Sequence, residues 1–485
     1  MSKKKVTATL KDGTKLEFLH SDNPPSGTMK KIFFSPKKDY AIGFYHDQTI
    51  ANDSQRLARI EAILTKYNAT ISEQDGGARG VTPFLAHYYQ DIFCWPQQIV
   101  VAPEFGITMP IYPSDFFFES GPFKGKEKNG KWFSSPKLRK LLPDSEKGTW
   151  INYLKIGILM ARAVSRLHVA GLAHSDLSSN NILIDPVRGR VAVIDIDSLV
   201  VPGLFPPDVL GTAGYIAPEV LATQHLPLTD PNRNHPSAVT DQHALAVLIY
   251  EYLLYRHPLR GPKVNSTAST EEDERMSMGE KALYVEHPTD RSNRPNNITV
   301  EASSLGPILE KLFQRAFIDG LHNPHERPAA IEWEKGLVKT WDLLVPCENS
   351  NCPSKWYVFT GDIKSGCPFC NTRRKGSLPY LKLRKETKPG QWMQDSQLVM
   401  YHNSSLFSWH AFDNVYSGPS ADKSPLAYCV WHHGKWLLVN QSLTSLTSPG
   451  GNLVPIGQAV ELTDGIQFRL SQEPHGRMVE VTIIQ

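Results

Sequence analysis

Two carboxylates and one amide stand at short intervals between residues 170 and 200. Asp176 is followed five residues later by Asn181, and Asp195 comes fourteen residues after that amide. Apolar runs flank this polar stretch, which places the three side chains in loops between structured elements. Phosphoryl transfer from a metal-bound nucleotide requires one carboxylate to orient the attacking hydroxyl, and an amide and a carboxylate to hold Mg²⁺. The spacing therefore predicts Asp176 as the base, with Asn181 and Asp195 as magnesium ligands.

The order of these residues resembles the catalytic loop of the protein kinase family. Residues 174–177 read H-S-D-L and, together with Asn181, are similar to the family pattern H-R-D-L-x-x-x-N. Residues 195–197 read D-I-D and stand where D-F-G is expected. The resemblance implies a two-lobed kinase fold, ATP and Mg²⁺ as cofactors, and proteins as substrates.

Three later motifs resemble the same family. Residues 211–219 read G-T-A-G-Y-I-A-P-E, like the end of a kinase activation segment. Asp241 resembles the helix-borne aspartate that supports the catalytic loop. Arg327 resembles the late arginine that pairs with the glutamate of A-P-E, here Glu219. Thr212, in its Gly-Thr context, favours serine and threonine over tyrosine as acceptors, so the resemblance implies a serine/threonine protein kinase.

Three positions depart from the family pattern. Ser175 replaces the arginine that in many kinases binds an activation-loop phosphate, which favours constitutive activity. Ser178 replaces the lysine that commonly steadies the transferred phosphate. Asp197 replaces the glycine of D-F-G, and is either an added metal ligand or a solvated turn carboxylate. These departures leave a second interpretation open, a nucleotide-binding pseudokinase scaffold that presents its other domains to partners.

The position of the nucleotide-binding lysine is unusual. Kinases normally carry this lysine on the third strand in the pattern V-A-I-K, but residues 40–44 read Y-A-I-G-F, with Gly43 at that place. Upstream, the chain aligns with the Gly-rich loop, with Gly27 as its second glycine and Lys30 at its third. This arrangement resembles the with-no-lysine kinases and predicts Lys30 as the phosphate-binding lysine. In the alternative, Lys30 and Lys31 are ordinary solvated lysines of a strand.

Further nucleotide-site residues follow from this alignment. Glu61 lies on a predicted helix that begins near Asp53, and we predict it as the partner of the phosphate lysine. Asp53 is the alternative partner, in which case Glu61 faces outward. Thr108, Met109 and Ile111 follow a predicted strand, and we expect the adenine-contacting hinge there.

Four cysteines cluster after residue 346. Cys347 and Cys352 form a C-x4-C pair, and Cys367 and Cys370 form a C-x2-C pair after fourteen intervening residues. Two such turns can place four thiolates at the corners of a tetrahedron, the geometry of a closed structural Zn²⁺ site. We predict a zinc ribbon with a docking or spacer role; four reduced structural cysteines are the alternative.

The elements that must position these residues follow from hydrophobic periodicity. Short alternating runs with one amphipathic helix fill most of the first 118 residues, whereas residues 150–341 show mainly helical periodicity. We predict an α+β chain with a bilobal kinase-like fold, a zinc ribbon and a small all-β sandwich. The predicted boundaries are 1–112 for the N-lobe, 113–344 for the C-lobe, 345–373 for the zinc ribbon, 374–390 for a basic linker and 391–485 for the sandwich.

The C-terminal segment loosely resembles a forkhead-associated β-sandwich. Residues 435–440, 454–457 and 461–465 are similar to the later strands of that family. No arginine lies between Arg384 and Arg469, so the phosphothreonine pocket of the family is not expected here. We interpret the segment as a protein-interaction module, with a purely structural sandwich as the alternative.

The order of kinase, zinc ribbon and degenerate forkhead-associated-like tail resembles the kinase of the bacterial tellurite-resistance-associated phosphorylation triad. In that triad, the kinase accompanies a von Willebrand factor A-domain protein and a metal-dependent protein phosphatase. The resemblance implies these two proteins as partners, in a bacterial stress or tellurite-resistance phosphorylation system.

Composition supports a globular chain of several domains. The 485 residues are 40% apolar and 21% charged, and their number exceeds what one hydrophobic core usually organises. A net charge of +3 is too mild for a nucleic-acid coat. No uninterrupted apolar stretch has signal-peptide or membrane-span length. We therefore expect a cytoplasmic protein whose partners are proteins, and we expect neither a membrane nor nucleic acid as a partner.

Overall fold

The computed structural model describes residues 4–27, 29–201, 211–227, 230–361 and 366–485. The chain folds into two compact units. The larger unit comprises residues 1–148, 155–295 and 313–334, and the smaller unit comprises residues 149–154, 296–312 and 335–485.

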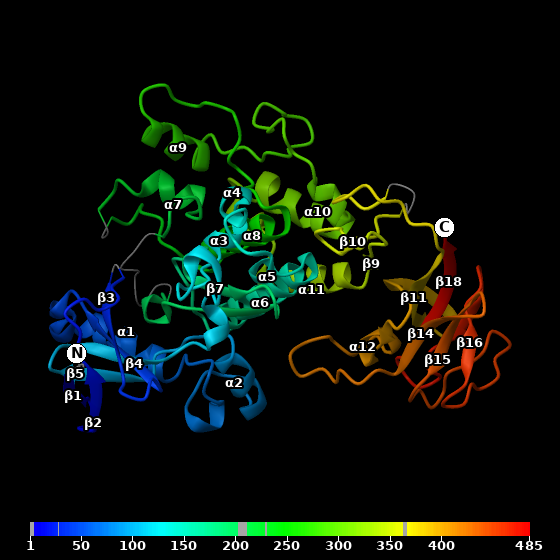
Figure 1. Ribbon diagram of the computed structural model, residues 1–485, viewed down its shortest axis with the longest axis horizontal. Coiled ribbons are helices and arrows are strands. Elements are labelled where there is room, and N and C mark those ends of the chain that lie inside the picture. Colours follow the sequence, from blue (N-terminus) through cyan, green and yellow to red (C-terminus); the bar gives the residue numbers. More distant parts are fainter. Residues whose placement is uncertain (1–3, 28, 202–210, 228–229, 362–365) are drawn as a thin grey trace. The chain divides into compact units, whose positions relative to one another are not determined.

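The larger unit begins with a six-stranded antiparallel sheet in the order β2-β1-β5-β6-β4-β3 (Figure 1). Its strands are β1 (Lys5–Leu10), β2 (Lys15–Leu19), β3 (Lys30–Phe34), β4 (Tyr40–Tyr45), β5 (Gln98–Ala102) and β6 (Gly106–Pro110). Phe18, Phe33 and Phe44 pack edge to face over one side of the sheet. Because side chains alternate along a strand, Lys30 of β3 and Tyr45 of β4 lie on the opposite side of the sheet.

Two helices accompany this sheet, α1 (Ser54–Leu64) and α2 (Pro83–Gln90). The Asp53 carboxylate caps α1 by accepting hydrogen bonds from two backbone N–H groups of its first turn. The buried residues Ile60 and Ile63 lie on the inner face of α1, as the periodicity predicts. The second helix was not expected, although Thr82 followed by proline is a usual helix start.

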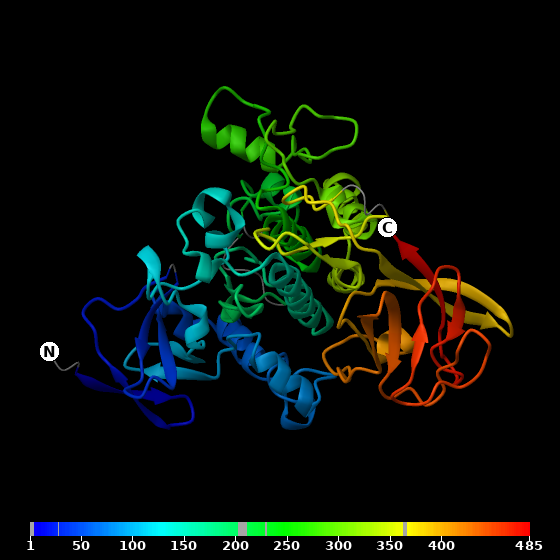
Figure 2. The same cartoon turned by 45° about the vertical axis from the view of Figure 1, so that its right-hand side comes forward.

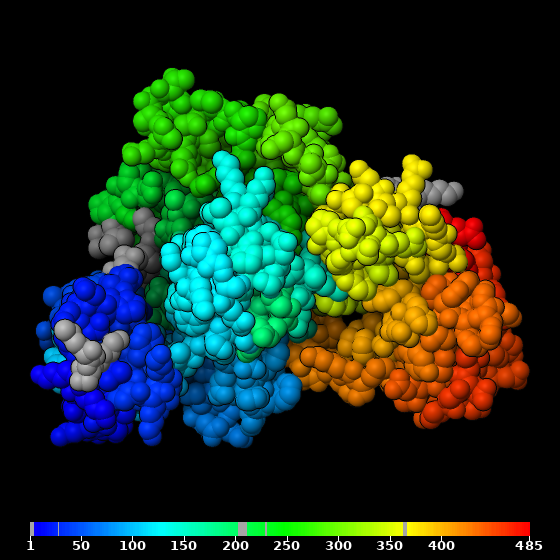
Figure 3. All heavy atoms as spheres, in the orientation of Figure 1, coloured from blue at the N-terminus to red at the C-terminus, as the bar shows by residue number. Residues whose placement is uncertain are grey.

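The remainder of the kinase-like segment is mostly helical. In α8, every residue from Ala244 to Leu254 is buried, so this helix forms the centre of the core. In the space-filling view, the segment that holds α3 to α5, coloured cyan, stands out on the visible face (Figure 3). The helices are α3 (Lys131–Ser134), α4 (Pro136–Arg139), α5 (Asp144–Lys147), α6 (Trp150–Val169), α7 (Pro218–Thr223), α8 (Ala238–Leu254), α9 (Thr270–Met278), α10 (Pro307–Gln314) and α11 (Ala330–Trp341), and the short hairpin between α6 and α7 comprises β7 (Ile182–Asp185) and β8 (Arg190–Val193).

The smaller unit contains a short hairpin, two four-stranded antiparallel sheets and the single-turn helix α12 (Ser408–Ala411). The sheet orders are β12-β11-β18-β17 and β13-β14-β15-β16, and the long β11–β12 pair is plain in Figure 2. The strands are β9 (Leu344–Pro346), β10 (Trp356–Val358), β11 (Leu378–Lys388), β12 (Gln391–Val399), β13 (Ser405–Leu406), β14 (Ala427–His432), β15 (Lys435–Asn440), β16 (Ala459–Glu461), β17 (Gln467–Arg469) and β18 (Met478–Ile484).

The predicted linker over residues 374–390 is wrong, because most of it forms β11, one of the two inner strands of its sheet. Leu381 and Leu383 are fully buried. The alternate residues Lys382 and Arg384 both form ion pairs with Glu480 of β18. The basic composition of the segment concealed a strand with period-two alternation.

The predicted boundary at residue 344 also differs from the observed one. The smaller unit includes residues 335–344, and Asp342 connects them to the β-domain. Its backbone carbonyl accepts a hydrogen bond from Val399 N (2.8 Å), and its carboxylate lies 3.2 Å from the ring of His410. The end of α11 therefore packs as part of the β-rich unit.

No helix within the described residues combines the length and apolar character needed to cross a bilayer.

Candidate active site

A cleft of about 580 Å³ lies in the larger unit, between the N-terminal sheet and the loops that follow α6. The sheet contributes Lys30, Ile107 and Met109, and the loops contribute the predicted catalytic and metal-binding residues. The latter are Asp176, Asn181 and Asp195. Lys30 and Asp195, which are 165 positions apart in the chain, thus face the same space.

The loop that carries Asp176 is supported by the buried side chain of Asp241 on α8. Its carboxylate accepts hydrogen bonds from the backbone N–H groups of His174 (2.7 Å) and Ser175 (3.3 Å). Ser175 adopts φ +63°, a left-handed conformation that these bonds help to hold. The predicted support of the catalytic loop by Asp241 is confirmed.

Asp176 is oriented by two neighbours. Thr212 Oγ1 donates a hydrogen bond to Asp176 Oδ1 (2.7 Å), and Asn181 Nδ2 donates to Asp176 Oδ2 (2.9 Å) and to its backbone carbonyl (2.8 Å). Because the Asn181 amide nitrogen is used in this way, its oxygen is the atom left to bind a cation. The arrangement fits a base next to a metal ligand.

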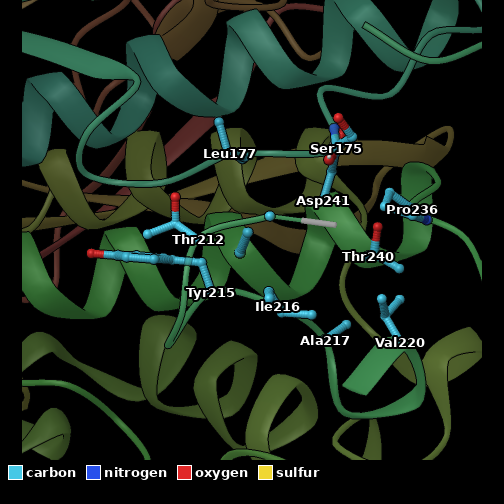
Figure 4. A pocket seen from close by; sticks show the side chains of 12 residues that line it. Ser175, Leu177, Thr212, Tyr215, Ile216, Ala217, Val220, Pro236, Thr240 and Asp241 are labelled. Carbon is cyan, nitrogen blue, oxygen red and sulfur yellow. Dashed lines mark hydrogen bonds between the residues drawn. The ribbon is translucent and has the colours of Figure 1, made fainter. Parts of the chain in front are cut away.

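The segment after residue 211 packs tightly against the catalytic loop. Figure 4 shows Thr212 and Tyr215 of this segment with Ser175 and Leu177 of the loop around a pocket of only about 10 Å³. Such a volume holds at most one water molecule, so this pocket is a packing interface and not a ligand site.

A largely buried ion pair connects Glu219, at the end of this segment, to Arg327. Arg327 Nη1 and Nη2 lie 2.7 and 2.8 Å from the two carboxylate oxygens of Glu219, and the Arg327 side chain is fully buried. Arg327 also donates to the carbonyl of Gly320 (2.8 Å). The predicted Glu219–Arg327 pair is confirmed with bidentate geometry.

Lys30 begins β3 and points into the cleft. In the β3–β4 register it stands opposite Tyr45, and the next residue, Lys31, faces the other side and is exposed. Lys30 Nζ lies 3.1 Å from Asp195 Oδ1 and 2.5 and 2.6 Å from the two oxygens of Asp197. Burial alone would lower the pKa of Lys30, but the Asp197 and Asp195 carboxylates outweigh it and raise the pKa above its usual value. The ammonium group therefore stays charged.

Gly43 leaves room for this lysine. It stands opposite Ile32 on β3, and a Cβ at its position would lie 3.2 Å from Lys30 Cδ and 2.8 Å from Met109 Cε. A side chain at residue 43 would thus compete with the aliphatic stem of Lys30. The glycine at the usual lysine position and the lysine on the neighbouring strand are structurally complementary.

The structure does not bring Glu61 to Lys30. Glu61 is about half exposed and pairs with the exposed Lys11 of the N-terminal hairpin. The alternative partner, Asp53, is occupied as the cap of α1. We therefore correct the partner of Lys30 from Glu61 to Asp197. The predicted helix is present, but its rotation directs Glu61 outward.

The other predicted nucleotide residues are distributed unevenly. Gly27 and Met109 line the cleft, whereas Thr108 and Ile111 do not. Thr108 alternates with its neighbours on β6 and is buried on the opposite side. Sequence reasoning missed Tyr112, which lines the cleft two residues after the end of β6.

The four predicted zinc ligands converge in the smaller unit. Cys347 and Cys370 have their Sγ atoms 3.6 Å apart, Cys352 and Cys367 have theirs 3.8 Å apart, and all four atoms lie within 4.8 Å of one another. A tetrahedral ion with Zn–S bonds of about 2.3 Å requires S···S distances of about 3.8 Å. The cluster is thus compatible with a structural zinc site.

The sequence profile of the protein kinase domain matches residues 142–331. The chain contains a protein kinase domain. The matched residues include Asp176, Asn181 and Asp195, whereas Lys30 and the predicted hinge residues lie before them.

Two curated kinases resemble the kinase domain. Serine/threonine-protein kinase pkn3 of Myxococcus xanthus is 27% identical over 191 residues, which cover 37% of this chain and 29% of that protein. Serine/threonine-protein kinase RAD53 of Saccharomyces cerevisiae is 31% identical over 105 residues, which cover 20% of this chain and 13% of that protein. The chain spans less than a third of the length of either relative.

Proposed function

We propose that this protein is an ATP- and Mg²⁺-dependent serine/threonine protein kinase whose phosphate-binding lysine is Lys30. The observation that carries the proposal is the convergence of Lys30, Asp176, Asn181 and Asp195 on one cleft. The names of the two relatives support serine and threonine as acceptors, as does the contact of Thr212 with Asp176.

Asp176 would act as the base that accepts the proton of the substrate hydroxyl. Its two hydrogen bonds, from Thr212 and Asn181, fix the carboxylate in one orientation before substrate arrives. Asn181 Oδ1 and Asp195 would hold Mg²⁺, which neutralises charge on the nucleotide phosphates.

Lys30 would place its ammonium group on the α- and β-phosphates. A lysine on β3 can replace the usual lysine on β4 because the two strands are paired. Ile32 of β3 lies opposite Gly43, and Lys30 lies two residues before Ile32 on the same side of the sheet. The absence of a side chain at Gly43, where a Cβ would lie 3.2 Å from Lys30 Cδ, and the burial of the Lys30 stem support this role over that of a solvated strand lysine.

A pseudokinase scaffold is the second candidate. It is favoured by Ser178, which stands where many serine/threonine kinases have a lysine that steadies the transferred phosphate, and which is fully buried. In that case the cleft would bind nucleotide without turnover, and the smaller unit would carry the function.

The Asp176→Asn variant distinguishes these two functions. We expect it to abolish transfer of radiolabel from γ-labelled ATP to the protein itself or to casein, while Mg·ADP binding is retained. The matched control is Asp22→Asn, which changes an almost fully exposed carboxylate. Equal labelling of the wild type and Asp176→Asn would favour the scaffold.

The smaller unit supports a more specific proposal about context. The four-cysteine cluster would hold structural Zn²⁺, and the two-sheet domain would act as a forkhead-associated-like interaction module. The order of these parts supports a von Willebrand factor A-domain protein and a metal-dependent phosphatase as partners in a bacterial tellurite-resistance system. Co-purification of the three proteins tests this assignment.

A further inference from the structure

We propose that Asp197, steadied by Tyr45, is the positioning residue that holds Lys30 in the nucleotide cleft, a task that no carboxylate of α1 performs here. This inference rests on the proposed function of Lys30. It assigns a role to a residue whose position in the motif would suggest either a metal ligand or a solvated turn.

The contacts of Asp197 fit a positioning role. Both of its carboxylate oxygens lie within 2.6 Å of Lys30 Nζ, and Oδ2 also accepts a hydrogen bond from Tyr45 OH (2.6 Å). Asp197 is only 6% exposed, so it is not a solvated turn carboxylate. Its oxygens are already engaged, which also argues against a role as an additional metal ligand.

The backbone explains how a residue two positions after Asp195 reaches the lysine. Asp195 has a left-handed backbone conformation with φ +62°, and a short 3₁₀ turn follows over Ile196–Ser198. This reversal directs both Asp195 and Asp197 toward the start of β3. Tyr45 reaches the same point because the sheet register places it opposite Lys30.

Asp195 and Asp197 contact Lys30 differently. Asp195 makes a single contact of 3.1 Å with Lys30 through Oδ1, so Oδ2 can serve Mg²⁺. Asp197 neutralises the lysine with two closer contacts. If Asp195 had to hold the lysine by itself, the same carboxylate would have to satisfy both an ammonium group and a metal ion.

The experiment compares Asp197→Asn, Lys30→Met and the double variant, each as the full chain. The first readout is the dissociation constant of Mg·ADP, measured by calorimetry, because it can be obtained for inactive variants. The second readout separates KM for ATP from KM for casein. We expect Asp197→Asn to weaken Mg·ADP binding and raise KM for ATP about tenfold, with KM for casein changed less than twofold.

The double variant separates positioning from a general structural role. If Asp197 acts through Lys30, Asp197→Asn should change Mg·ADP affinity less than twofold in the Lys30→Met background. Equal weakening in both backgrounds would overturn the inference. Tyr45→Phe, which removes one hydrogen bond and keeps both charges, should weaken binding about threefold and serves if Asp197→Asn does not fold.

Glu61→Gln provides the contrasting test. Because Glu61 pairs with Lys11 outside the cleft, the Mg·ADP affinity of the Glu61→Gln variant should remain within twofold of that of the wild type. A tenfold loss in Glu61→Gln, with none in Asp197→Asn, would overturn the inference. If Lys30→Met itself leaves binding and turnover unchanged, the proposed role of Lys30 fails instead, so the two failures are distinguishable.

Discussion

Replacing each of two neighbouring lysines tests the proposed nucleotide site most directly. Lys30→Met keeps the length of the stem but removes a charge that lies within the cleft. At about 4 Å from a phosphate charge and an effective dielectric constant of about 20, that charge contributes roughly 4 kcal/mol. A barrier increase of this size corresponds to a rate loss on the order of 10³-fold.

The same substitution also affects stability. Lys30→Met leaves Asp197 buried without its cation, and loss of one partner of a buried pair costs about 3 to 5 kcal/mol. Urea unfolding must therefore accompany the rate measurement, so that lost activity is not confused with lost folded protein. Lys31→Met is the matched control, because Lys31 is exposed on the other side of β3 and its change should stay within about 0.5 kcal/mol.

A rescue experiment uses the geometry around Gly43. A side chain at residue 43 would have its Cβ 3.2 Å from Lys30 Cδ and 2.8 Å from Met109 Cε. Lys30→Ala removes the first of these two atoms. The additional substitution Gly43→Lys then fits if Met109 Cε moves. We expect the pair of substitutions to recover part of the rate measured by radiolabel transfer. An inactive Lys31→Met would show that the register differs by one residue, and an active Lys30→Met would refute the role of Lys30.

Three further predictions concern stability and metal content. The purified protein should carry about one zinc per chain by elemental analysis, and Cys352→Ser should lower that content and the melting temperature; a metal-free wild type would refute the site. Arg327→Met should cost about 3 to 5 kcal/mol in urea unfolding, since it leaves Glu219 unpaired; a loss below 1 kcal/mol would contradict the importance of the pair. Burial raises the pKa of Glu251 to about 7 despite the hydrogen bond from Tyr215 OH, so the folded state retains a proton that the unfolded state loses near pH 4.5. Stability should therefore fall by roughly 3 kcal/mol as pH rises from about 4.5 to 7, and Glu251→Gln should remove that fall in urea titrations at several pH values.

The catalytic loop could be predicted because its information is local. Asp176 and Asn181 lie within six residues of each other, so their spacing alone restricts what they can do together. The alternation of side chains along a strand likewise predicts that only one of Lys30 and Lys31 faces the cleft. Such features need no knowledge of how distant segments meet.

The partner of Lys30 could not be predicted in the same way. Neighbouring residues on a helix differ by about 100° in direction, so a small rotation of α1 decides whether Glu61 points inward or toward Lys11. Asp197 is 167 residues away in the chain, and its reach depends on the left-handed conformation of Asp195. These relations are tertiary, and no short motif contains them.

The outward pairing of Glu61 has a consequence for the role of helix α1. In protein kinases, the phosphate-binding lysine usually pairs with a glutamate of the helix that follows its strand, and this ion pair must be in place for activity. Here the lysine is anchored to Asp197 and Tyr45 instead, so displacement of α1 leaves that anchor intact. A movement of α1 should therefore leave the position of Lys30 in the cleft unchanged.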